Sequence, residues 1–354
     1  MAKQNTIVLT GGGTAGHVMP HIAMLDTYKN LGWDVVYIGS NGIEKKLMSQ
    51  LGVRFLEIPA GKLRRYISFQ NFLDIFKVIL GFLKSIYHLL RVKPNLVFSK
   101  GGFVSVPVSI AAWILRIPVY SHESDLTPGL ANKIINPFAK KIFYCFPDTR
   151  KYLDGSKSQL VGLPIRPSLK KGDRSKAYKL CGFSEDDGKD VLLVMGGSLG
   201  AQRINDALAT AMDDLLTRFN IIHITGAGKS SGINADGYKS FEFVGDELKD
   251  LFAITDVVVS RAGANSIFEF YSLQIPMVLV PLEAGSRGDQ VHNSMSFEKQ
   301  GLATLLREKN LNNSSLREAI DKRMSAKSEE GESFIPHNSI DLIVANFREQ
   351  LDSK

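Results

Sequence analysis

The sequence predicts an α/β protein built from two doubly wound domains, each with a parallel sheet covered by helices. Short apolar runs alternate with helical patterns along the chain, and this alternation restarts in the second half. Each half also opens with a strand, a glycine loop and a helix. The 354 residues, 44% of them hydrophobic and 22% charged, suit two globular domains of ordinary size.

The first half contains short apolar runs that are typical of strands. They lie at residues 5–10, 33–40, 53–60, 95–102, 117–124 and 141–146. Segments with helical periodicity separate them, for example residues 21–32 and 103–116. This alternation favours a parallel sheet with helices on both faces.

The second half repeats the pattern after a polar stretch at residues 170–190. Its predicted strands lie at residues 191–201, 220–228, 240–246, 256–264, 275–282 and 302–308. Pro164 and Pro167 suit a stiff connector, so we place the domain boundary within residues 162–169. We therefore expect an N-terminal domain of residues 1–163 and a C-terminal domain of residues 164–354, whose last helix can pack back on the N-terminal domain.

The first glycine loop raises the question of a dinucleotide. Gly11, Gly13 and Gly16 fit the spacing G-x-G-x-x-G directly after the first predicted strand. A dinucleotide site also needs an acidic side chain at the end of the second strand, where Gly39 and Ser40 stand instead. This argues against a dehydrogenase and favours glycines that let the backbone approach another diphosphate.

Charge and cysteine content narrow the class of protein further. The formal net charge of +7 favours an anionic partner, but the chain has no basic block, zinc-ligand spacing or aromatic RNA-binding signature, so we expect no nucleic acid. Cys145 and Cys181 show no metal or redox spacing, which predicts two buried, reduced thiols. The first strand follows the N-terminus without a signal peptide, which predicts a cytoplasmic protein.

A set of motifs in a fixed order links the chain to a known family. They are GGTAGH at 12–17, SKGGFVSVP at 99–107, HESDLTPGLANK at 122–133, MGGSLGA at 195–201, SRAGANSIFEF at 260–270 and GDQVHN at 288–293. Together these motifs resemble the MurG family of N-acetylglucosaminyltransferases. One position departs from the pattern, because the family's first loop commonly reads GGTGGH and this chain has Ala15. Its methyl group slightly narrows the approach of a diphosphate.

The resemblance implies a GT-B glycosyltransferase, with two Rossmann-like domains facing across a cleft. It implies UDP-GlcNAc bound mainly by the second domain and undecaprenyl-diphosphate-linked muramyl-pentapeptide bound mainly by the first. GlcNAc would pass to the muramyl 4-hydroxyl with inversion, as a step of peptidoglycan precursor synthesis, which makes other cell-wall synthesis proteins candidate partners. The sequence contains no D-x-D motif for a nucleotide-bound metal. We therefore expect neither a metal nor a cofactor, and a diphosphate neutralised by loop amides and helix N-termini.

The resemblance assigns Glu269 to the uridine ribose hydroxyls. Its neighbours Phe268 and Phe270 are apolar, which argues against a simple solvated glutamate. The backbone amides at the start of the same helix are expected to face the nucleotide phosphates. These amides belong to Ala264, Asn265 and Ser266.

Further donor contacts follow from the resemblance. Asp289 and Gln290 stand where the family reads the sugar hydroxyls, although Asp289 could also cap a helix. Arg166 resembles the arginine at the domain junction, and Ser198 resembles the serine of the second glycine loop. Val244 occupies the position whose backbone pairs with the uracil edge.

The acceptor side needs a base for the attacking hydroxyl, and a histidine or a carboxylate can serve. The candidates are His17, at the end of the first glycine loop, and the group His122, Glu123 and Asp125. The resemblance favours His17 as the base, with Glu123 orienting it or stabilising charge and Asp125 contacting substrate. The acceptor-side loop residues expected at the substrate are Thr14, Ala15 and Gly16.

Residues 69–91 form one long helical pattern with excess apolar surface. We expect the sheet-facing stripe to comprise Phe72, Phe76, Ile79, Leu83, Ile86 and Leu90, and the narrow polar side to comprise Asp74, Lys77, Gly81, Lys84, Ser85 and His88. The apolar residues left over are Ile75, Val78, Phe82 and Leu89. Nearby cations are Lys62, Arg64, Arg65, Lys77, Lys84, Arg91 and Lys93. The pattern predicts a peripheral protein that docks on an anionic membrane, on its cytoplasmic face.

Other functions share the predicted design. A diacylglycerol glucosyltransferase would use another acceptor, and a UDP-GlcNAc 2-epimerase would release free sugar; the segments 99–107 and 122–133 argue against both. A catalytically silent sugar-nucleotide sensor would keep Glu269 and Gln290 but would need no base. His17 and Glu123 count against that sensor.

Overall fold

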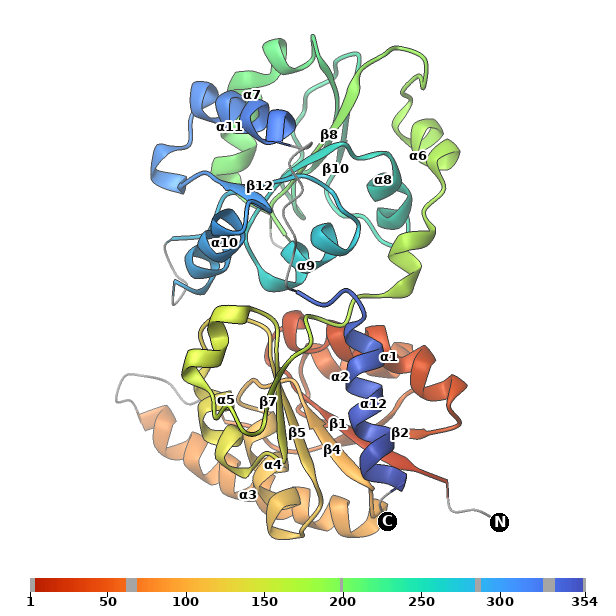
Figure 1. The fold of residues 1–354 in the computed structure, drawn as a ribbon, viewed down its shortest axis with the longest axis vertical. Coiled ribbons are helices and arrows are strands. Elements are labelled where there is room, and N and C mark those ends of the chain that lie inside the picture. The colour runs from red at the N-terminus through yellow and green to blue at the C-terminus, as the bar shows by residue number, and fades with distance from the viewer. Residues whose placement is uncertain (1–3, 62–68, 198–199, 284–287, 327–334, 353–354) are drawn as a thin grey trace. The chain divides into compact units, whose positions relative to one another are not determined.

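The computed structural model describes residues 4–61, 69–197, 200–283, 288–326 and 335–352, and within residues 69–75 it describes the backbone only. The chain divides into two compact units (Figure 1). The first, called the N-unit here, comprises Met1–Arg166 and Ile335–Lys354. The second, the C-unit, comprises Pro167–Phe334.

The N-unit contains a seven-stranded parallel sheet. Its strands are β1 (Thr6–Thr10), β2 (Asp34–Gly39), β3 (Arg54–Glu57), β4 (Leu96–Ser99), β5 (Val119–Glu123), β6 (Lys141–Tyr144) and β7 (Ser158–Leu160). They lie in the order β3-β2-β1-β4-β5-β6-β7, so the direction of winding switches between β1 and β4. Loops at the carboxyl ends of these two strands therefore flank the place where α/β sheets bind ligands.

Helices cover both faces of this sheet. They are α1 (Met19–Asn30), α2 (Ile43–Gln50), α3 (Phe69–Val92), α4 (Ser105–Ile114), α5 (Leu130–Ile135) and α12 (Ser339–Asp352). Alternation along β1 divides the core, because Ile7 and Leu9 pack with α1 and α12 while Val8 packs with α3 and α4. Short 3-10 helices lie at Ala15–His17, Asn136–Phe138, Pro147–Tyr152, Pro167–Lys171 and Glu308–Asn310.

The last helix, α12, belongs to the N-unit. Its Phe347 is fully buried, with ring centroids 5.2 Å from Phe98 and 4.9 Å from Tyr120. Ile343 and Val344 join the same core. The compact units thus differ from the ranges 1–163 and 164–354, because the apolar face of α12 completes the N-unit core.

The C-unit contains a second parallel sheet, of six strands. Its strands are β8 (Asp190–Met195), β9 (Phe219–Ile224), β10 (Tyr238–Phe241), β11 (Val257–Ser260), β12 (Met277–Leu279) and β13 (Ala303–Leu305), in the order β10-β9-β8-β11-β12-β13. Its helices are α6 (Arg174–Cys181), α7 (Gln202–Leu215), α8 (Leu248–Ile254), α9 (Ala264–Ser272), α10 (Asp289–Lys299) and α11 (Asn313–Ser325). The predicted fold class, two doubly wound parallel-sheet domains, is confirmed.

The strand β7 and the helix α6 were not predicted. β7 is only three residues long and has a single apolar residue, Leu160, so it lacks a strand pattern. The polar stretch 170–190 contains α6, which has clear end signals: the Asp173 side chain accepts from the Lys176 N–H at 3.1 Å, and Gly182 follows the helix with φ +74°.

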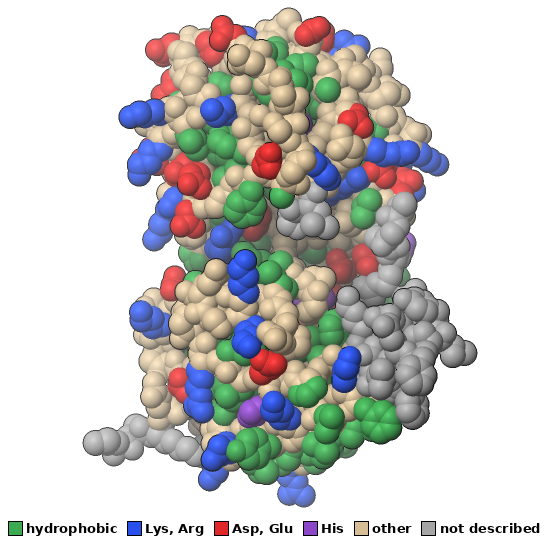
Figure 2. Space-filling view, turned by 180° about the vertical axis from the view of Figure 1, so that it is seen from behind, with side chains coloured by type: hydrophobic (Ala, Val, Ile, Leu, Met, Phe, Trp, Pro, Cys, Tyr) green, Lys and Arg blue, Asp and Glu red, His purple; other side chains and the backbone are tan. Residues whose placement is uncertain are grey.

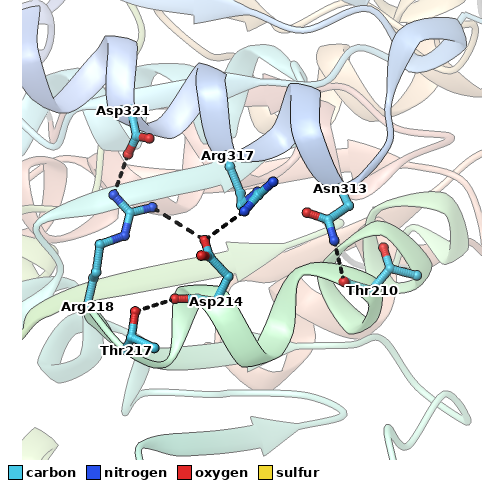
Figure 3. Close-up of polar contacts among 7 residues, drawn as sticks. All are labelled: Thr210, Asp214, Thr217, Arg218, Asn313, Arg317 and Asp321. Atoms are coloured by element: carbon cyan, nitrogen blue, oxygen red, sulfur yellow. Dashed lines mark hydrogen bonds and ion pairs between the residues drawn. The ribbon is translucent and has the colours of Figure 1, made fainter.

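An ion-pair network lies between α7 and α11 (Figure 3). Arg218, just after α7, contacts Asp321 at 2.7 Å and Asp214 at 3.9 Å. Arg317 of α11 reaches the same Asp214 carboxylate at 3.2 Å. Because these side chains are about half exposed, each pair contributes less than about 1 kcal/mol, and the apolar contact of both helices with the sheet supplies most of the stability.

Both cysteines are free and buried, as predicted. Burial raises the pKa of the Cys145 thiol well above its usual range and that of Cys181 to about 11. Both are therefore protonated near neutral pH, which is typical of structural rather than reactive thiols.

The prediction for the faces of α3 was mostly wrong. Of the predicted sheet-facing residues, Ile86 packs against the core, whereas Phe76, Ile79, Leu83 and Leu90 are exposed. The side that packs on the sheet carries Gly81, Phe82, Ser85 and Leu89. A Cβ on Gly81 would lie 2.2 Å from the Pro59 carbonyl oxygen, so the small residues face inward because the backbones approach closely. The exposed side is a row of apolar residues, called the apolar ridge here: Phe76, Ile79, Leu80, Leu83, Tyr87 and Leu90.

Candidate active site

The glycine loop after β1 passes close to the loop after β4. Gly13 has φ +86°, and its neighbour Gly12 could not carry a Cβ, which would lie 2.6 Å from the carboxyl group of Glu44. A Cβ on Gly102, in the second loop, would lie 2.2 Å from the Gly12 carbonyl oxygen. Gly13 and Thr14 are exposed at the tip of the loop, whereas residues 15–17 are partly exposed. Of the predicted loop residues, Thr14 therefore lies in solvent and Ala15 and Gly16 begin the helical turn.

The fully buried carboxylate of Glu44, at the start of α2, was not predicted. It accepts from the Ser40 N–H at 3.1 Å, from the Ser40 hydroxyl and from the Gly13 N–H at 3.4 Å. A dinucleotide site would have an acidic side chain at the end of β2 that binds the ribose. Here the nearby acidic side chain, Glu44, binds the protein's own loop instead. Glu44 holds the glycine loop in shape rather than offering a carboxylate to a ribose.

His17 lies at the end of this loop with its ring orientation set by a backbone group. Its Nδ1 lies 3.1 Å from the Lys100 carbonyl oxygen, the first carbonyl after β4. A carbonyl can only accept, so in the neutral ring Nδ1 carries the proton and Nε2 is the unprotonated nitrogen. This tautomer is the one that a general base needs.

Glu123, the last residue of β5, fastens the loop that follows it. Its carboxylate accepts from the Asp125 N–H at 3.0 Å, the Gly129 N–H at 2.9 Å and Nδ2 of Asn132 at 2.8 Å. Burial, together with the nearby Asp125 carboxylate, raises the pKa of Glu123 to about 7. These contacts suit a positioning residue, while Asp125 is half-buried in the loop that Glu123 shapes.

The C-unit has its own glycine loop after β8. Gly197 and Gly200 have φ +78° and +68°, and a Cβ on Gly200 would lie 2.1 Å from the Thr225 carbonyl oxygen. The loop therefore packs against the segment after β9. Ser198, the residue predicted to contact the donor, lies outside the described residues.

The start of α9 carries the predicted nucleotide residues. Ala264, Asn265 and Ser266 form its first turn, after Gly263 as N-cap. Glu269 lies three residues beyond Ser266, hence on the same side of the helix, and is partly exposed while both neighbouring phenylalanines are buried. Helix amides and a carboxylate thus share one face at the carboxyl end of β11.

The start of α10 lies at the same edge of the sheet. Gly288 is its N-cap with φ +81°, so Asp289 is the first helical residue and does not cap the helix. The Gln290 side-chain oxygen accepts from the Leu282 N–H at 2.9 Å, which leaves its amide N–H donors for other partners. Asn293 donates to the Ala262 carbonyl at 3.4 Å and so connects α10 to the loop before α9.

The strand order brings these C-unit segments together. β8, β11 and β12 are neighbours, so the glycine loop, the start of α9 and the segment before α10 all leave the sheet at one edge. Val244 is half-buried in the loop after β10, next to Phe243, whose side chain is 75% exposed. Arg166 is half-buried at the end of the first N-unit segment.

Comparison with known proteins agrees with this arrangement. The Glycosyltransferase family 28 N-terminal domain matches residues 7–144, and the Glycosyltransferase family 28 C-terminal domain matches residues 191–336. A crystal structure of Acinetobacter baumannii MurG superposes with a TM-score of 0.77 over 98% of this chain and 99% of that chain, at 21% identity. Two family 28 domains with the fold of that enzyme define the protein as a glycosyltransferase of the GT-B class.

Closer relatives identify the family. UDP-N-acetylglucosamine--N-acetylmuramyl-(pentapeptide) pyrophosphoryl-undecaprenol N-acetylglucosamine transferase of Geobacillus kaustophilus is 51% identical over 89% of this chain and 89% of its own. The enzyme of the same name from Staphylococcus carnosus is 51% identical over 91% of this chain and 90% of its own. The chain therefore belongs to the MurG family of N-acetylglucosamine transferases.

Proposed function

We propose that the protein transfers GlcNAc from UDP-GlcNAc to undecaprenyl-diphosphate-linked muramyl-pentapeptide. The observation that carries this function is the identity of 51% with transferases of that name, over nine-tenths of both chains. The fold alone would not distinguish it, because a UDP-GlcNAc 2-epimerase from Methanocaldococcus jannaschii superposes with a TM-score of 0.65. A diacylglycerol glucosyltransferase, the other alternative, would differ in its acceptor.

The C-unit is the proposed donor-binding unit. Glu269 accepts hydrogen bonds from the ribose hydroxyls, and Gln290 and Asp289 contact the sugar hydroxyls. The diphosphate is neutralised by the first-turn amides of α9 and by the glycine loop that contains Ser198. The backbone of Val244 pairs with the uracil edge, and Arg166 contributes a cation to the donor.

The proposed reaction is a single inverting displacement. The muramyl 4-hydroxyl oxygen forms a bond to the anomeric carbon of GlcNAc while the bond from that carbon to the β-phosphate oxygen breaks, and UDP leaves. His17 Nε2 takes the hydroxyl proton. Glu123 and Asp125 shape the acceptor loop, and Thr14, Ala15 and Gly16 line its approach.

The test of this function is donor and acceptor selectivity in a transfer assay. Purified protein with labelled UDP-GlcNAc and a short-chain muramyl-pentapeptide lipid is expected to yield the disaccharide lipid, whereas UDP-glucose with diacylglycerol yields no product. Transfer of glucose to diacylglycerol, or release of free sugar from UDP-GlcNAc without acceptor, would replace the proposed function by one of its alternatives.

The apolar ridge on α3 supports docking on a membrane surface. Between 49% and 56% of each ridge side chain is exposed. Lys77, Lys84 and Arg91 lie seven residues apart along one edge of the ridge and are also exposed. Figure 2 shows hydrophobic side chains gathered along the base of the N-unit with Lys and Arg beside them. Among the described residues, no helix is both long and apolar enough to cross a membrane.

We infer that this ridge inserts into the headgroup region of an anionic, cytoplasmic-face membrane, where cations contribute about 1 kcal/mol each. Several residues named in the sequence-based membrane prediction are not suitable for testing this inference. Lys62, Arg64 and Arg65 lie outside the described residues, as do the side chains of Phe72, Asp74 and Ile75. Phe82 packs into the core, so its replacement would destabilise the fold rather than probe the surface.

Replacing Ile79 and Leu83 by Ser is expected to weaken binding to anionic vesicles by at least about tenfold, because each buried aliphatic side chain contributes about 1.5 to 3 kcal/mol. Vesicle sedimentation measures the effect. The matched control changes Leu51 and Leu180, which are also exposed but do not belong to α3, and should bind like the wild type. Wild-type binding by the Ile79/Leu83 variant would rule the ridge out.

A further inference from the structure

The side chain of Lys100, which the proposed reaction leaves without a role, is buried beneath the acceptor loop. Lys100 directly follows β4 and is 1% exposed. Its ammonium group donates to Ser124 Oγ at 2.8 Å and to Nδ1 of His122. Both acceptors are neutral. A buried cation is costly without specific partners, so its position here calls for a role that an apolar side chain could not fill.

The protonation of His122 follows from its other contact. Its Nε2 lies 2.9 Å from the Gly162 carbonyl oxygen, so Nε2 carries the proton and Nδ1 accepts from the Lys100 ammonium. Burial, and then the charge of Lys100, lowers the pKa of His122 well below its usual value, so this ring stays neutral. The hydrogen bonds thus run in one direction, from Lys100 through His122 to the Gly162 backbone.

Lys100 also contacts the proposed base through its backbone. The same residue whose carbonyl fixes His17 Nδ1 reaches with its side chain to Ser124, between Glu123 and Asp125. One residue therefore connects the glycine loop after β1 with the acceptor loop after β5. These two loops lie on either side of β4 in the sheet.

We propose that Lys100 is a positioning residue for transfer, whose buried ammonium holds the acceptor loop at Ser124 in register with the ring of His17. This inference rests on the proposed function. A charged donor makes stronger hydrogen bonds than a neutral one, so loss of the charge loosens the loop without removing the base.

The charge of Lys100 changes within a pH range that experiments can reach. Burial lowers the pKa of Lys100 from its usual value to about 8, although nearby acidic groups oppose the shift. The lysine is therefore charged below pH 8 and becomes neutral above it. Among the groups that face Lys100, Glu123 has a pKa of about 7, which is lower than that of Lys100. The pKa values of His21 and His122 are lower still, and the pKa of the Cys145 thiol is higher. The groups that face it are His21, His122, Glu123, Asp125 and Cys145.

The test compares Lys100→Met with the wild type. Met retains the length and the backbone carbonyl, so we expect kcat to fall at least about tenfold while KM for UDP-GlcNAc stays within about twofold. Wild-type kcat should decline above about pH 8, and this alkaline limb should be absent from the variant. Ser124→Ala, which removes one acceptor of the Lys100 ammonium, should also lower kcat. A merely structural lysine predicts a lower melting temperature with the limb retained, and that result overturns the proposal.

A second readout does not depend on activity. NMR of protein labelled with carbon-13 at the lysine Cε should show one signal that titrates near pH 8 and is absent from Lys100→Met. If the wild type transfers no GlcNAc, the proposed function fails while this titration still reports on Lys100. A Lys100 signal that titrates at the ordinary lysine value contradicts a buried, neutral-partnered ammonium and overturns the inference.

Discussion

His17→Ala is expected to lower kcat by about a hundredfold or more while leaving the affinity for UDP unchanged. A positioned general base contributes about 10² to 10⁴ in rate. In the proposed reaction, the tautomer set by the Lys100 carbonyl leaves Nε2 to accept the hydroxyl proton. Single-turnover kinetics with bound UDP-GlcNAc measures the chemical step directly.

His17→Asn separates the two contributions of the ring. The Asn side chain can still donate to the Lys100 carbonyl, but it offers no base, so its rate should match that of the Ala variant. Both variants should bind UDP as the wild type does, because His17 is not among the residues proposed to contact the donor. Near wild-type turnover in either variant would show that His17 is not the base, and Glu123 or Asp125 would become the candidate.

Glu269→Ala is expected to weaken UDP binding by at least about tenfold. A carboxylate that meets two ribose hydroxyls makes charge-assisted hydrogen bonds, each contributing about 1.5 to 3 kcal/mol. Glu269 is partly exposed between two buried phenylalanines, so its replacement should leave the α9 packing intact. Isothermal titration calorimetry with UDP measures the loss.

Two further variants calibrate that measurement. Glu269→Gln keeps one neutral acceptor and should lose part of the affinity, whereas Glu318→Ala, an exposed glutamate on α11, should lose none. A folded Glu269→Ala protein with unchanged UDP affinity would contradict the assignment of Glu269 to the ribose.

The fold was predictable because both sheets are buried on both faces. β1 illustrates this: Ile7, Val8 and Leu9 are all fully buried, so the strand appears as a continuous apolar run between glycine and helix signals. β7 escaped prediction because an edge strand of three residues needs little apolar surface. For the last helix we allowed packing on the N-terminal domain, where α12 lies, but its apolar positions alone do not specify which sheet they cover.

The orientation of α3 was not predictable from its apolar periodicity. Both of its sides are apolar, and the side that faces the sheet is decided by the close approach of Gly81 to the backbone at Pro59. Ser85 can lie inward because its hydroxyl donates to the Gly81 carbonyl at 2.6 Å. The exposed apolar ridge thus departs from the general rule that apolar residues face the core.

The site was predictable only where its residues lie within motifs. His17 and Glu269 belong to such motifs, but the residues that fix the acceptor-side loops come from segments distant in sequence. Glu44 reaches the glycine loop from α2. Lys100, which follows β4, contacts His122 on the neighbouring strand β5. Lys100 lies within the motif at 99–107. The signal available in the sequence was a lysine directly after an apolar strand, which is unusual.

The most direct test of the central claim is the structure of the product. The wild-type protein should convert UDP-GlcNAc and the short-chain muramyl-pentapeptide lipid to UDP and a lipid heavier by one N-acetylhexosamine. NMR of that lipid should show a β-linkage to the muramyl 4-position, because a single displacement inverts the α-configuration of the donor. An α-linkage, a sugar attached elsewhere, or free sugar with no change in the lipid would contradict the account.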